Sequence, residues 1–160
     1  YGEQEGHVRE QAARFGLTDR VVLHGKVPRH EVLSAVKGAS LAVAIVSIEE
    51  EVSPDISGMV PAKIFEAIGL GTPVLLIAPS GSDATAVTAP TGLVTSFTAT
   101  DSHGIASYLK AVIRGQRDRS DNVEAFSWLT IGRKLDAVLR QAMSSHGHVQ
   151  SDGRELEARR

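Results

Sequence analysis

Short apolar runs alternate with helix-patterned segments along this chain, and that alternation restricts its fold more than any other feature. Runs of strand length occupy residues 21–24, 41–46 and 74–77. Apolar side chains recur with the helical period of 3.6 residues at 4–15, 28–37, 60–68, 105–113 and 131–142. Residues 92–94 form a further short strand or extended piece. This order predicts an α/β fold, a Rossmann-like parallel sheet with helices on both faces.

The chain has 160 residues, a length suited to one domain. We place that domain at residues 1–143 and expect the polar, aperiodic residues 144–160 to form a disordered tail. Tyr1 leads directly into helical sequence without an initiator methionine. We therefore interpret the chain as part of a larger domain.

Composition removes several classes of function. The sequence contains no cysteine, which excludes disulfide frameworks, thiolate zinc sites and cysteine nucleophiles. A net charge of −2 gives no global reason to expect a nucleic acid as partner. No apolar run approaches the roughly 20 residues of a membrane span, and we expect a cytoplasmic location. No spacing of His, Asp and Glu predicts a metal site, and no Walker or Gly-x-Gly-x-x-Gly loop occurs.

The loops that follow the apolar runs are the expected ligand sites, because parallel sheets bind ligands at the carboxyl ends of their strands. The richest of them leads into the helix that begins near Pro61. The unpaired N–H groups and the dipole at such a helix start suit a phosphate, and Gly58 allows close backbone approach. Glu66, opposite the apolar helix face, suits paired ribose hydroxyls, and Lys63 could add charge near a pyrophosphate. The alternative is an exposed Lys63–Glu66 pair without a ligand.

This segment resembles the hallmark of a known enzyme family. Pro61, Lys63 and Glu66 have the spacing Pro-x-Lys-x-x-Glu, and Gly-Thr-Pro-Val follows at 71–74. The pattern is similar to that of the family 4-type ("group 1") retaining glycosyltransferases, which have the GT-B fold. Residues 19–28, 91–94 and 126–128 resemble further family signatures in the right order. The resemblance covers about residues 1–143 and implies the C-terminal, donor-binding half of a GT-B fold, without its first strands.

The resemblance implies a role for each matching position. Glu66 would bind the ribose hydroxyls of the donor. The diphosphate would be held by Ser57, Gly58, Met59, Val60 and Lys63. The base would lie near Gly25, Val27 and Pro28. No catalytic residue is identified, and no metal or other cofactor is expected beyond the nucleotide-sugar substrate.

One position departs from the family pattern. The family usually has a second, sugar-binding glutamate eight residues before the ribose-binding glutamate. Counted from Glu66, this chain has Gly58 at that position. Glu51 and Asp55, with Glu49 and Glu50, lie in the right loop to replace it, and the alternative is a solvated acidic loop. His24 is the one histidine placed to contact a ligand, the alternative being packing at a strand end. We expect Phe126 and Trp128 to be packing anchors.

The implied function is transfer of a sugar, with retention, from a nucleoside diphosphate donor such as a UDP-sugar. The acceptor site would come from a missing N-terminal domain or a partner chain, so we expect this chain alone to be inactive. Its sheet, without its first strands, should expose apolar residues. Two alternatives stay open: a nucleotide-sugar epimerase of similar fold, and a non-catalytic nucleotide-sugar-binding subunit.

Overall fold

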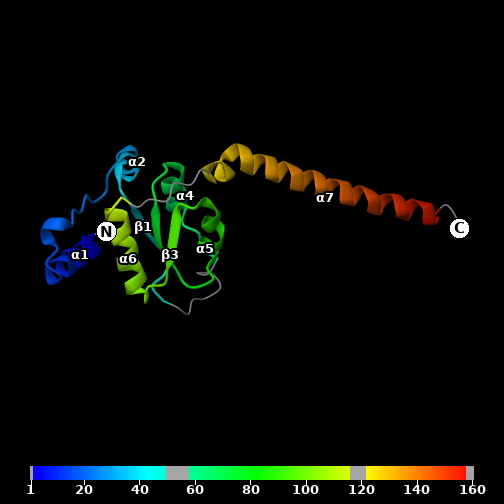
Figure 1. Cartoon of the computed structure of the whole chain (residues 1–160). Coiled ribbons are helices and arrows are strands. Elements are labelled where there is room, and N and C mark those ends of the chain that lie inside the picture. The colour runs from blue at the N-terminus through cyan, green and yellow to red at the C-terminus, as the bar shows by residue number, and fades with distance from the viewer. Residues whose placement is uncertain (1, 50–57, 116–121, 158–160) are drawn as a thin grey trace.

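A computed structural model describes residues 2–49, 58–115 and 122–157 of the chain (Figure 1). Its α-helices are α1 (Gly2–Arg14), α2 (Arg29–Gly38), α4 (Ala62–Gly69), α5 (Asp83–Thr88), α6 (Ser102–Ile113) and α7 (Trp128–Glu157). Its strands are β1 (Ala42–Ile45), β2 (Val74–Ile77) and β3 (Val94–Phe97). Short 3-10 turns are η1 (Thr18–Arg20), η2 (Ala89–Thr91) and η3 (Asn122–Phe126).

The three strands form one parallel sheet in the order β1-β2-β3. β2 is central, and all four of its residues are buried. A strand covered on both faces needs a continuous apolar run, and Val-Leu-Leu-Ile supplies one. The predicted α/β class, a parallel sheet between helices, is therefore confirmed.

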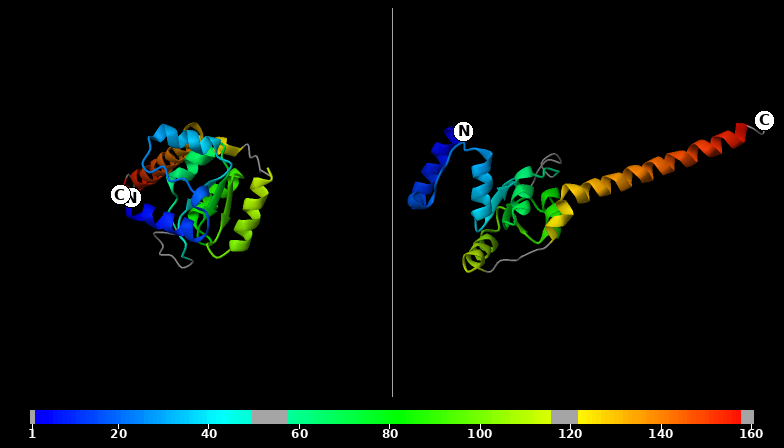
Figure 2. Two further views of the ribbon diagram at one scale, coloured as in Figure 1. Left: turned by 90° about the vertical axis from the view of Figure 1, so that its left-hand side faces the viewer. Right: turned by 90° about the horizontal axis from the view of Figure 1, so that it is seen from above.

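Helices cover both faces of the sheet. On one face α4 and α5 pack over Ala44 of β1 and Leu76 of β2. Ile64, Ala67 and Ile68 of α4 are buried in this core, which confirms the predicted apolar face of that helix. On the other face lies α6, where the Phe97 and Tyr108 ring centroids are 5.8 Å apart (Figures 1 and 2).

The face that carries α6 is covered only in part. Val43 and Ile45 of the edge strand β1 are 58% and 53% exposed. Their register partners in β2, Leu75 and Ile77, are buried. The cover thus ends between β2 and β1, and the edge strand presents apolar side chains to solvent.

Residues 21–24 are not a strand, and that prediction was wrong. The segment is extended, with Val21 at φ −108° and ψ 118°, but it joins no ladder. Val22 is 72% exposed. β-branched residues favour extended backbone, yet a strand also needs a neighbour to bond, and no described segment offers one here.

α7 is longer than the pattern predicts and extends away from the sheet (Figures 1 and 2). It continues through residues 144–157, most of the expected disordered tail. No proline follows Pro90 to interrupt it, and Arg140 pairs with Asp136 one turn away at 2.8 Å. Across the described ranges, no helix is both long and apolar enough to cross a membrane.

Candidate functional site

The start of α4 lies where the sequence predicts a phosphate-binding loop. Pro61, with φ −64° and ψ 127°, caps the helix without a side-chain hydrogen bond. Gly58 and Met59 are exposed before it, whereas Val60 packs against the core. Ser57, Glu51 and Asp55 lie outside the described residues. The described backbone directly before α4 is therefore accessible at Gly58 and Met59, and the first turn of the helix carries no side-chain cap.

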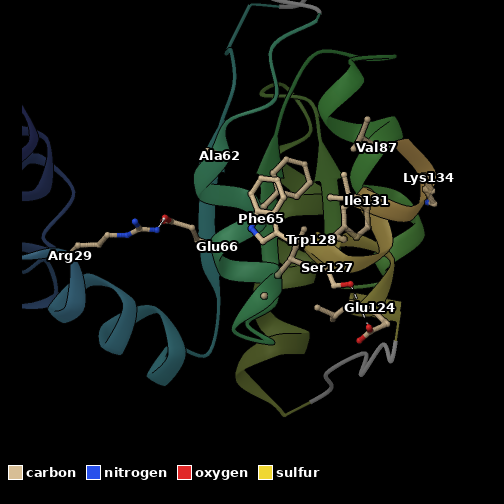
Figure 3. A pocket seen from close by; sticks show the side chains of 14 residues that line it. Arg29, Ala62, Phe65, Glu66, Val87, Glu124, Ser127, Trp128, Ile131 and Lys134 are labelled. Carbon is tan, nitrogen blue, oxygen red and sulfur yellow. Dashed lines mark hydrogen bonds and ion pairs between the residues drawn. The ribbon is translucent and has the colours of Figure 1, made fainter. Parts of the chain in front are cut away.

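Glu66 lies in the second turn of α4 and extends toward α2 (Figure 3). Its Oε1 accepts a hydrogen bond of 2.6 Å from Nη2 of Arg29, the first residue of α2. The side chain of Glu66 is 40% exposed and that of Arg29 is 77% exposed. Glu66 therefore pairs across 37 residues of sequence rather than with Lys63, its neighbour on the helix.

The expected base-binding residues lie directly before α2. Gly25 has φ 65°, a left-handed conformation that favours glycine. Pro28 caps α2, and Val27 is half-buried. Because Arg29 follows Pro28 directly, its contact with Glu66 brings the end of this loop toward the expected ribose residue.

A hydrogen bond fixes α2 beside α4. Thr72, 2% exposed in the turn between α4 and β2, donates from Oγ1 to the carbonyl oxygen of Val36 at 2.8 Å. Val36 also packs against the core. α2 has no fully buried residue, so these two contacts near its C-terminal end do much to hold it.

A groove of about 930 Å³ runs along the outer side of α4 toward the start of α7. Arg29 and Glu66 lie at one end of it, and Glu124 and Lys134 line it elsewhere. The rest is mostly apolar, and Phe65 points away from Glu66 to meet Phe126 with ring centroids 5.6 Å apart (Figure 3). Within the part of the chain that the structure describes, none of the expected diphosphate or base residues lines this groove. The polar pair and the aromatic cluster therefore line different parts of the same groove.

Two expectations about single side chains have different outcomes. Phe126 packs against Phe65, as expected of an anchor. Within the described part of the chain Trp128 is 88% exposed, so the prediction that it is a packing anchor was wrong. Trp128 is the first residue of α7, which extends away from the domain at this point. His24 is exposed in the extended segment.

Sequence reasoning missed Arg29. Its partner lies 37 residues away on another helix, so no local spacing relates the two. The one available signal was its position, directly after the loop expected to hold the base. Among the described residues no cluster of three or more His, Asp or Glu side chains is placed to hold a metal ion.

No family model matches the chain, and neither a curated protein nor a solved structure shows significant similarity to it. The α/β fold with a parallel sheet is established by the structure itself. The glycosyltransferase resemblance rests on the four sequence stretches alone and stays a prediction.

Proposed function

We propose that this chain is the nucleotide-sugar-binding part of a retaining glycosyltransferase. Its donor would be a sugar linked to a nucleoside diphosphate. The acceptor site would be supplied by a further domain or by a partner chain, and a cytoplasmic location is part of the proposal.

The observation that carries this proposal is the surroundings of Glu66. Its carboxylate is accessible on the side of α4 that faces α2, and only Oε1 has a partner among the described residues. A carboxylate accepts hydrogen bonds and so suits the adjacent hydroxyls of a ribose. The loop assigned to the base ends at Arg29, the residue that contacts Glu66.

Catalysis in the complete enzyme would be mainly a matter of position and electrostatics. The accessible loop before α4 would bind the diphosphate through backbone N–H groups, and Lys63 would add a positive charge. Stabilising the departing diphosphate lowers the barrier to breaking the sugar–phosphate bond. Holding donor and acceptor together converts a bimolecular step into an effectively unimolecular one. No bound metal is required by this scheme.

Calorimetric titration of the chain with UDP and with GDP tests the proposal. We expect one of them to bind, and Glu66→Ala to weaken that binding by about 1.5–3 kcal/mol, the value of a hydrogen bond to a charged group. Glu5→Ala is a matched control, because Glu5 is also an accessible glutamate in an arginine pair, 2.7 Å from Arg9 on α1. Binding of neither diphosphate, or equal binding by Glu66→Ala and the wild type, would contradict the donor-site assignment.

A further inference from the structure

The Arg29–Glu66 ion pair joins two separate helices. Three ion pairs occur within the described residues, and the other two, Arg9–Glu5 and Arg140–Asp136, each span one turn of a single helix. Pairs one turn apart are common on any charged helix surface. The Arg29–Glu66 pair instead requires α2 and α4 to be held in a fixed relation, which the Thr72–Val36 hydrogen bond supports.

Stability does not explain this pair. Both side chains are well exposed, at 77% and 40%. Exposed ion pairs contribute little to stability, because water screens the charges and two long side chains must be ordered. Its main consequence is that the Glu66 side chain, which is otherwise free to rotate, has a defined position.

The Arg29–Glu66 contact uses one nitrogen of the guanidinium and one oxygen of the carboxylate. Nη2 of Arg29 donates to Oε1 of Glu66, and no residue in the described part of the chain donates to Oε2. A carboxylate offers about four lone-pair sites over its two oxygens. Glu66 can therefore stay bonded to Arg29 while Oε2 accepts hydrogen bonds from a ligand.

We propose that Arg29 is a positioning residue for the nucleotide ribose, holding Oε1 of Glu66 so that Oε2 accepts from the ribose hydroxyls. This inference rests on the proposed function. Arg29 acts through Glu66, so its influence should be confined to the part of the ligand that Glu66 contacts. A nucleotide without the 2′-hydroxyl leaves Glu66 only the 3′-hydroxyl to bind, so its affinity should depend less on Arg29.

The ribose preference of the binding site provides the test. Calorimetry would compare UDP with 2′-deoxy-UDP, and GDP with 2′-deoxy-GDP, on the wild type, Glu66→Gln, Arg29→Gln and Arg29→Lys. We expect the wild type to prefer the ribonucleotide, and Glu66→Gln to lose most of that preference. Arg29→Gln should weaken ribonucleotide binding by about two- to five-fold, because an exposed ion pair restricts the Glu66 side chain only weakly. Because the contact is a single hydrogen bond, Arg29→Lys should restore much of the preference.

Arg9→Gln is the matched control, since it breaks a comparable exposed pair of 2.7 Å on α1 and should change neither affinity. Far-UV circular dichroism would establish that each variant is folded. If Glu66→Gln loses the ribose preference and Arg29→Gln keeps it, the role of Arg29 is overturned and the donor site survives. Equal weakening of both nucleotides by Arg29→Gln also overturns it. If the wild type binds neither ribonucleotide, the proposed function itself fails.

Discussion

Replacing Thr72 by valine should loosen the attachment of α2. The two side chains are nearly the same size, so the change removes one hydrogen bond, the 2.8 Å contact from Thr72 Oγ1 to the Val36 carbonyl. In the variant that carbonyl still accepts a hydrogen bond from the Ala39 N–H at 3.1 Å. The loss should therefore be the net value of a hydrogen bond, about 1 kcal/mol, rather than the larger penalty for an unpaired buried group.

Thr88→Val provides the matched control. Thr88 is fully buried and donates to the Ala84 carbonyl at 2.6 Å, but this bond lies within α5. Urea unfolding should show both variants destabilised by about 1 kcal/mol. Hydrogen exchange should distinguish them, with α2 amides exchanging about five times faster in Thr72→Val alone. Equal protection of α2 in the two variants would refute the claim that Thr72 holds this helix.

Three further predictions concern the fold. Leu76→Ala creates a cavity at a side chain of 0% exposure in the central strand, so it should lower the free energy of unfolding in urea by about 2–5 kcal/mol. Leu135→Ala, at a side chain that is 57% exposed, should change that free energy by less than about 0.5 kcal/mol. Gly71→Ala should lower the free energy of unfolding by about 1–2 kcal/mol, because Gly71 has φ 72°, which an alanine adopts only with strain. Gly69→Ala, within α4 and with open space around it, should leave that free energy unchanged or raise it in the same urea assay. Asp101→Ala removes the cap that accepts from the Gly104 N–H at 2.9 Å, so thermal unfolding should show a loss of about 1 kcal/mol, and an unchanged midpoint would contradict the capping role.

The central part of the fold follows from local sequence. The apolar run at 74–77 predicts β2 because a strand buried on both faces has no polar alternation. The spacing of Ile64, Ala67 and Ile68 likewise predicts the buried face of α4. Such patterns succeed where burial alone decides the structure.

Features that depend on distant neighbours could not be predicted in this way. Residues 21–24 have the composition of a strand but no strand beside them. The predicted piece at 92–94 overlaps β3 only at Val94, because the polar residues Thr95 and Ser96 conceal the rest of the strand. In the candidate site, the exposed carboxylate of Glu66 was predicted from its place opposite the apolar helix face. Its partner Arg29 was not, since tertiary packing alone brings α2 against α4.

A structure of the chain bound to UDP or GDP tests the central claim most directly. The account predicts the ribose hydroxyls within hydrogen-bonding distance of the Glu66 carboxylate, about 2.6–3.2 Å, with the base toward Gly25 and Pro28. A nucleotide whose base stacks in the aromatic part of the groove, on Phe65 and Phe126, with Glu66 still bound only to Arg29, would contradict it.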